Sequence, residues 1–290
     1  MPARVTRQSE PQVAPQGWKG IPAQKLLKRC ELCEWRCGVD RTAGQRGPCG
    51  LGIETRILRQ YVSVTEELEV IPALRVYLGG CNFRCRFCDT APDCLEPDRG
   101  DLPDPGTYAH ELAGAVGRGV QSISVLGGEP TLHAHTLLEW AAAAPTPLPL
   151  VVNTNLYMTG EVLEVLEGVV TRYLADLKFG NDACAQRLAG VPHYSDVVRR
   201  NLTWIAGRTP LIVRHLLMPG HLECCLRPAA EWLAANLPGT GFQLYAGYVP
   251  CWQAGTVGLG RLNSREEVRA ALDLLDTLDL NWRAGGNDKA

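Results

Sequence analysis

Three cysteines stand in the stretch CNFRCRFCD, at Cys81, Cys85 and Cys88, with the aromatic Phe87 before the last of them. Soft thiolates of this kind select iron–sulfur clusters, zinc or copper(I). A structural zinc site or an electron-carrying cluster normally takes four protein ligands, whereas three leave one metal with an open position. The spacing therefore favours a metal centre that can bind a substrate. A zinc knuckle completed by Cys94 or a nearby histidine is the alternative.

A second group of cysteines lies in the run CELCEWRCGVDRTAGQRGPCG, residues 30–50, which we call the leader. Its thiols belong to Cys30, Cys33, Cys37 and Cys49, and its glycines allow a tight fold around a small ligand. Four thiolates suit a closed site, either structural zinc or an electron-relaying iron–sulfur cluster. Free reduced thiols, or a redox disulfide between the first two cysteines, remain alternatives.

The other cysteines are scattered, and we interpret them mainly as small buried apolar residues. They are Cys94, Cys184, Cys224, Cys225 and Cys251. The consecutive pair Cys224–Cys225 follows a PGH turn near an expected strand end. A catalytic or second-metal role is therefore the alternative for that pair.

The bulk composition is that of an ordinary globular chain. Its 290 residues carry a net charge of −2, with 46% hydrophobic and 21% charged residues. This length suits one large α/β domain with a small appendage, and the charge gives no general attraction to nucleic acid or anionic membrane. The polar, proline-rich start has no apolar signal core, and no run is apolar enough to span a membrane. We therefore predict a cytoplasmic protein, and clustered cysteines in such a chain are typical of metal or redox sites.

Strand-like and helix-like segments alternate from residue 73 onwards. The expected strands are residues 73–80, 120–128, 149–155, 173–179, 210–218 and 242–249. The expected helices are residues 108–119, 136–144, 160–169, 196–207 and 227–237, with a last helix at 264–278. Such alternation predicts parallel strands with crossover helices. We predict an α/β fold, a partial (β/α)6 barrel of the TIM type with a cysteine-rich N-terminal extension, although periodicity alone does not exclude a doubly wound sheet.

This fold would divide the chain into three parts: residues 1–70 as an N-terminal arm with the metal-binding leader, 71–262 as the core barrel, and 263–290 as a C-terminal helix and tail. The residues with chemical potential follow the expected strands. They are residues 81–88, 127–130, 153–155, 176–178 and 214–221. Ligands of parallel α/β folds gather at the carboxyl ends of the strands, so these segments are predicted to form one site.

The spacing Cys81-x3-Cys85-x2-Cys88, followed one βα unit later by LGGEP (126–130), resembles the radical S-adenosylmethionine (SAM) enzymes over residues 71–262. The resemblance implies a partial barrel with a four-iron four-sulfur cluster on the three cysteines. The amino and carboxylate groups of SAM would chelate the fourth iron. An external one-electron reductant of the flavodoxin or ferredoxin type would drive cleavage of SAM to a 5′-deoxyadenosyl radical, which abstracts a hydrogen atom from a substrate.

The same resemblance implies a set of SAM-binding residues: Phe87, Gly127, Gly128, Glu129, Asn153, Asn155, Asp176, Lys178, Arg214 and His221. The two glycines would let the backbone approach the methionyl ammonium. Structural alternatives are core packing for Phe87, a structural carboxylate for Glu129, turn formation for the asparagines and a snorkelling strand-end lysine for Lys178. Arg214 and His215 alternate along one strand, and the register favours Arg214 as the inward residue.

The motifs ADLKF (175–179) and LLMPGH (216–221) resemble activating enzymes of glycyl radical enzymes, such as pyruvate formate-lyase activase. Together with the leader, they make the chain similar to the pyruvate formate-lyase activating enzyme-like group. Activation of a glycyl radical enzyme is the leading hypothesis. Radical modification of a peptide or small molecule, with an accessory metal site, is the alternative within catalysis. A non-enzymatic cluster or zinc protein that carries electrons or bridges partners is the alternative outside it.

Overall fold

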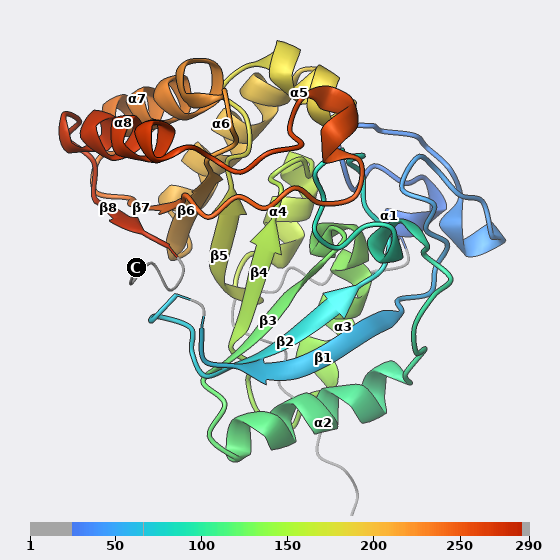
Figure 1. Cartoon of the computed structure of the whole chain (residues 1–290). Helices are drawn as coiled ribbons and strands as arrows, with labels where there is room; N and C mark the ends of the chain where they lie inside the picture. The colour runs from blue at the N-terminus through green and yellow to red at the C-terminus, as the bar shows by residue number, and fades with distance from the viewer. Residues whose placement is uncertain (1–24, 66, 286–290) are drawn as a thin grey trace, which may run out of the picture.

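The computed structural model describes residues 25–65 and 67–285 and contains one sheet of eight strands in sequence order (Figure 1). The strands are β1 (Ile57–Ser63), β2 (Ala73–Leu78), β3 (Ser122–Gly127), β4 (Leu150–Thr154), β5 (Val170–Asp176), β6 (Leu211–Leu216), β7 (Gly241–Tyr245) and β8 (Trp282–Ala284). Strands β2 to β8 run parallel, and β1 is antiparallel to β2. The six strands expected from the sequence correspond to β2–β7. The N-terminal arm expected before residue 25 lies outside the described residues.

The helices from α2 onwards connect successive parallel strands and pack on the outer face of the sheet, whereas α1 precedes β1 (Figure 1). The helices are α1 (Lys25–Lys28), α2 (Pro105–Gly117), α3 (Ala134–Ala143), α4 (Gly160–Leu166), α5 (Asp182–Ala189), α6 (Tyr194–Ala206), α7 (Arg227–Asn236) and α8 (Arg265–Asp276). Because the strand order never reverses, the sheet lacks the switch point of a doubly wound fold. The chain therefore forms an open, partial barrel with β1 and β8 at its edges.

Local sequence signals explain where several helices begin. Asp104 accepts a hydrogen bond from the Thr107 amide at the start of α2, directly before a proline. Ser264 and Glu267 form a reciprocal capping box at the start of α8. Helix α5 was not among the expected helices, although Asn181 caps its first turn and Gly190 ends it in the left-handed conformation. Its eight residues are too short for a clear helical period.

An apolar layer fills the amino-terminal end of the barrel. It is formed by Val70, Val151, Leu174 and Ile212, with Ile71 packed against it. Val70 belongs to the connection between β1 and β2, and this connection also reaches the opposite edge of the sheet. There Glu69 forms a two-pronged ion pair with Arg283 of β8, at 2.7 and 2.8 Å. The connection thus bridges the open side of the barrel.

The leader packs beside the carboxyl ends of β3 and β4. Its buried Arg41 donates to the carbonyl of Leu132 at 2.8 Å, and Cys33 pairs with Met158 in a short antiparallel bridge. Trp35 donates its indole N–H to the carbonyl of Asn82, the residue after Cys81, at 2.8 Å. The leader is therefore in contact with the loop that carries the first cysteine group.

Among the described residues, no helix combines the length and apolar character that crossing a membrane requires.

Candidate functional site

Residues 81–88, which we call the cysteine loop, leave the carboxyl end of β2 and rest against α5. The Arg84 and Arg86 amides donate to the carbonyls of Ala189 and Leu188 at 3.0 and 2.9 Å. Cys81, Cys85 and Cys88 are free thiols and all half-buried. The Phe83 amide donates to the Cys81 sulfur at 3.4 Å. Three accessible thiols on one fixed loop fit the three-cysteine donor set of a cluster with one open iron.

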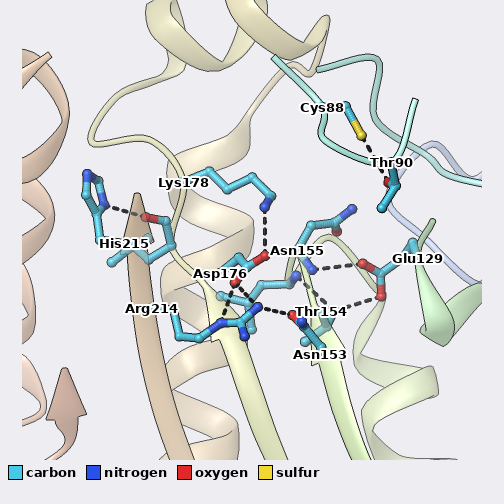
Figure 2. A network of polar contacts seen from close by, with 12 residues as sticks. Cys88, Thr90, Glu129, Asn153, Thr154, Asn155, Asp176, Lys178, Arg214 and His215 are labelled. Atoms are coloured by element: carbon cyan, nitrogen blue, oxygen red, sulfur yellow. Dashed lines mark hydrogen bonds and ion pairs between the residues drawn. The ribbon is translucent and has the colours of Figure 1, made fainter. Parts of the chain in front are cut away.

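Cys94 also lies in this site; the sequence analysis treated it mainly as a core residue and, in the alternative, as the residue that completes a zinc knuckle. Its sulfur lies 3.7 Å from that of Cys88. The Thr90 hydroxyl lies 3.2 Å from the Cys88 sulfur (Figure 2). Hydrogen bonds from Cys94 and then from Thr90 lower the pKa of Cys88 to about 6, against the effect of burial. Burial raises the pKa of Cys85 to about 12, although the positive charge of Lys178 opposes this shift.

The glycine-rich motif packs against the backbone that leads into the cysteine loop. A Cβ atom on Gly128 would lie 1.8 Å from the Gly80 carbonyl oxygen. Gly127 has φ +116°, and its Cβ would lie 2.5 Å from backbone atoms of Leu78. The Glu129 amide donates to the same Gly80 oxygen at 2.9 Å. Contact between β2 and β3 therefore requires both glycines, and their approach to the methionyl ammonium stays a prediction.

Glu129 is buried, with 1% of its surface exposed, and its carboxylate joins β3 to β4. It accepts hydrogen bonds from the Thr131 amide and hydroxyl at 3.2 and 2.7 Å. It also accepts from the Thr154 hydroxyl and from the Asn155 amide, each at 2.8 Å (Figure 2). Burial raises the pKa of this carboxyl, while the hydrogen bonds lower it. These contacts are those of the structural alternative. Asn155 extends the same network to the cysteine loop, since its side-chain amide donates to the Asn82 side chain at 2.7 Å.

The expected strand-end residues of β4, β5 and β6 meet in one charged group inside the barrel (Figure 2). Asp176 accepts from Lys178 at 2.7 Å and from two nitrogens of Arg214 at 2.7 and 2.8 Å. Arg214 also donates to the Asn153 side chain. Burial raises the pKa of Asp176, but the charges of Arg214 and Lys178 outweigh it and hold the pKa below its ordinary value. The group combines two cations with one carboxylate at the end of the barrel where the cysteine loop lies.

Arg214 has the inward orientation that the register predicted, and His215 lies on the other face of β6. His215 stacks on Phe242 and shares a hydrogen bond of 2.6 Å with the Leu177 carbonyl oxygen.

The sequence analysis missed two further residues of the barrel interior, Glu67 and Tyr245. Buried Glu67 lies 3.6 Å from Arg214 and accepts from the Tyr245 hydroxyl at 2.8 Å. Glu67 stands before the first expected strand, so only tertiary structure brings it here.

Phe87 and His221, which were predicted to bind SAM, contact residues outside the charged group around Asp176. The Phe87 ring is buried and packs edge-to-face on Phe179, with ring centres 6.1 Å apart. This is the core position that was its alternative. The His221 ring contacts three cysteine sulfurs and Arg187. The roles of Phe87 and His221 toward SAM stay predictions.

Several thiols of the leader lie in electrostatic range of one another. Cys30 interacts with Cys37 and Cys49, and Cys33 interacts with Cys49 and Cys30. Burial raises the pKa of Cys33 to about 12, opposed mainly by the Trp35 amide. The leader turns tightly at Gly47, where a Cβ would lie 2.6 Å from the Cys37 sulfur. A metal at these thiols stays a prediction.

A family model with the description Radical SAM superfamily matches residues 76–233, which is more than half of the chain. The chain belongs to the radical SAM superfamily. As a radical SAM protein it uses a four-iron four-sulfur cluster and SAM. The matched residues run from β2 into α7 and include the cysteine loop, the glycine-rich motif and the charged group around Asp176.

The chain is similar to several known proteins. An uncharacterized protein of Methanocaldococcus jannaschii is 30% identical over 272 residues, which cover 89% of this chain and 78% of that protein. A 7-carboxy-7-deazaguanine synthase of Methanothermobacter thermautotrophicus is 31% identical over 86 residues, which cover 30% of this chain and 34% of the synthase. The crystal structure of Streptococcus suis SuiB bound to SAM is 17% identical with a TM-score of 0.54, over 71% of this chain and 48% of SuiB. The chain thus matches about half the length of SuiB, and this likeness shows the fold alone.

Proposed function

We propose that this radical SAM protein cleaves SAM reductively and removes a hydrogen atom from a separate substrate. The observation that carries the proposal is the meeting of three segments at one end of the barrel. The cysteine loop follows β2, the glycine-rich motif follows β3, and Asp176 ends β5 two residues before Lys178. The electrostatic influence of Lys178 on Cys85 links the last of these segments to the first.

Cys81, Cys85 and Cys88 would hold the cluster, because they supply three thiolates from one loop. When bound, the cluster and SAM supply a one-electron cleavage of a carbon–sulfur bond that yields a 5′-deoxyadenosyl radical, with the electron taken from a flavodoxin or ferredoxin type of reductant. The protein's own contribution is orientation. Gly128 and Glu129 fix the end of β3 against the cysteine loop, and the ammonium of Lys178 offers donors to an anionic group of SAM.

Support for a small-molecule or short-peptide substrate comes from the segment between β7 and α8, residues 246–262. This segment runs from β7 across to the cysteine loop, where the Gln253 amide donates to the Arg86 carbonyl at 3.0 Å (Figure 1). It is also held by Arg187 of α5, which donates to the Val257 carbonyl at 3.0 Å. A site bordered in this way suits a small molecule or a short peptide better than a folded protein. SuiB, which has the same fold, is known in a complex with the precursor peptide SuiA.

Activation of a glycyl radical enzyme is the second candidate function. The ADLKF and LLMPGH motifs favour it, because they resemble the corresponding strand ends of such activases. Asp176 and Lys178 of the first motif form the ion pair at the end of β5, at 2.7 Å. This candidate requires that a glycine loop of a large partner enter beside residues 246–262.

The test is formation of 5′-deoxyadenosine by anaerobically reconstituted protein with SAM and a strong reductant. We expect the wild-type protein and Cys251→Ser to form it, and Cys85→Ala to form none. Absence of 5′-deoxyadenosine from wild-type protein that contains the cluster would refute cleavage and favour an electron carrier. Glycine-deuterated glycyl radical enzyme then separates the two substrate classes. Deuterium transfer into 5′-deoxyadenosine supports activase function and contradicts the small-substrate proposal.

A further inference from the structure

A second cluster of metal-ligating side chains lies outside the site described above. Cys184, His221, Cys224 and Cys225 place their ligand atoms within 4.8 Å of one another. The Nδ1 atom of His221 lies 3.3 Å from the Cys224 sulfur, 3.4 Å from the Cys225 sulfur and 3.8 Å from the Cys184 sulfur. The sulfurs of Cys224 and Cys225 are 4.0 Å apart. All except the half-buried Cys224 are buried.

These distances are those of one tetrahedral metal ion. With Zn–S bonds of about 2.3 Å and Zn–N bonds of about 2.0–2.1 Å, a tetrahedral site separates two sulfurs by about 3.8 Å and a sulfur from the imidazole nitrogen by about 3.5 Å. Cysteines of a cubane cluster lie farther apart, since each binds a different iron. We propose that Cys184, His221, Cys224 and Cys225 bind a structural Zn²⁺ ion.

The surrounding backbone holds the cysteines in place. Asn181 caps α5 by accepting from the Cys184 amide at 2.8 Å, and its side-chain amide donates to the Cys224 carbonyl at 2.6 Å. Gly180 permits this close approach, because a Cβ there would lie 2.8 Å from the Cys224 carbonyl oxygen and 2.5 Å from that of Cys225. Cys224 and Cys225 belong to a π-helical turn, η4 (Leu222–Leu226), a rare geometry that is frequent at functional sites.

Arg187 is a further polar contact of the cluster, besides the Asn181 side-chain amide, which donates to the Cys184 sulfur at 3.5 Å. One of its guanidinium nitrogens lies 3.1 Å from Nε2 of His221. Arginine only donates, so this contact puts the proton of a neutral imidazole on Nδ1, which faces the sulfurs. Zinc on Nδ1 moves that proton to Nε2. Zinc binding should therefore displace Arg187 from the ring, while its other contact, with the Val257 carbonyl, can persist.

The position of the cluster defines what the ion would do. It joins α5, which follows β5, to the turn η4, which follows β6. Gly180, which packs on Cys225, lies two residues after Lys178 in the sequence. Four protein ligands leave no open position, so the ion is structural and takes no part in catalysis. It would fix the ends of β5 and β6, which carry Asp176, Lys178 and Arg214, and this role does not depend on the substrate.

The first test uses full-length protein purified from cells without added metal. Because the leader is also a candidate zinc site, zinc is measured in Cys30→Ser/Cys33→Ser protein. We expect about one zinc per chain, as one closed site requires, and an X-ray absorption spectrum that reports three sulfurs and one nitrogen. A spectrum with sulfur ligands only, absence of zinc, or iron in its place would overturn the proposal. So would a disulfide between Cys184 and Cys224 in protein isolated under reducing conditions.

Variants of the wild-type chain give an independent test. Cys184→Ser/Cys224→Ser should lose about one zinc per chain, whereas Cys251→Ser, outside the cluster, should lose none. His221→Cys keeps four ligands, so it should keep its zinc and shift the spectrum of this site to four sulfurs. This variant decides the question if the double serine variant does not fold. Equal zinc contents in the double serine variant and Cys251→Ser, or loss of one zinc in His221→Cys, contradict the proposal.

Discussion

Replacing Gly128 by alanine should both destabilise the protein and move the cysteine loop. The added Cβ would start 1.8 Å from the Gly80 oxygen, and contacts of this kind below 3.0 Å essentially never occur. The two backbones must therefore separate by about 1.2 Å, which has the cost of overpacking, about 1–3 kcal/mol. The same shift weakens the 2.9 Å hydrogen bond from the Glu129 amide to Gly80, a loss of about 0.5–1.5 kcal/mol. We expect the free energy of unfolding to fall by about 2–4 kcal/mol.

Urea unfolding of the apoprotein measures this change, and iron content with 5′-deoxyadenosine formation measures its effect on the site. Gly80 directly precedes Cys81, so we expect the alanine variant to bind less iron and to lose most SAM cleavage. Gly117→Ala is the matched control, because a Cβ there has no atom within 4 Å. Its unfolding free energy should change by less than about 1 kcal/mol. The reasoning is refuted if Gly128→Ala behaves like this control in stability and in cleavage.

Three other substitutions probe different interactions. Asp176→Asn leaves Arg214 and Lys178 without their shared carboxylate. Because these side chains are only partly exposed, the free energy of unfolding measured in urea should fall by about 2–4 kcal/mol. A fall of less than about 1 kcal/mol would contradict this reasoning. Hydrogen bonds from Arg261 lower the pKa of Glu267 to about 2, so Glu267→Gln should cost about 1 kcal/mol at pH 7. A carboxyl whose pKa is lowered by folding contributes its full stabilisation only above its unfolded pKa of about 4.3. The difference in unfolding free energy between the wild-type protein and Glu267→Gln should therefore narrow when urea unfolding is repeated from pH 4 downward. A difference that widens in acid would contradict this reasoning. Arg283→Ala removes the ion pair with Glu69, whose side chains are 40% and 38% exposed. Although this pair bridges the barrel opening, its loss should change the unfolding free energy by less than about 1 kcal/mol. A fall of more than about 2 kcal/mol would show that the bridge is more than a surface pair.

Local patterns along the chain were sufficient to predict the architecture and the family. Each expected strand from residue 73 to residue 249 appears in the barrel, because buried parallel strands are continuous apolar runs between turns. The strands at the edges, β1 and β8, were not predicted. β1 has an exposed centre, and β8 has three residues, so neither has the apolar run that marks a buried strand.

Some residues of the candidate site could also be predicted from the sequence, and others could not. Cys81, Cys85 and Cys88 were identifiable because a ligand loop concentrates its donors within a few residues. Asp176 and Lys178 were identifiable because they end a recognisable strand. Motif and position together predicted where these side chains would meet, since the carboxyl ends of parallel strands share one edge.

What the tertiary structure alone decided is which distant residues share an environment. Glu67, in the connection between β1 and β2, lies 3.6 Å from Arg214 of β6. Cys184 and His221 meet although 36 residues separate them in the sequence. Side-chain periodicity reports the direction of a residue within its own element, whereas contacts between loops depend on how the elements pack. The meeting of Cys184, His221, Cys224 and Cys225 and the polar interior of the barrel therefore became visible only in the folded chain.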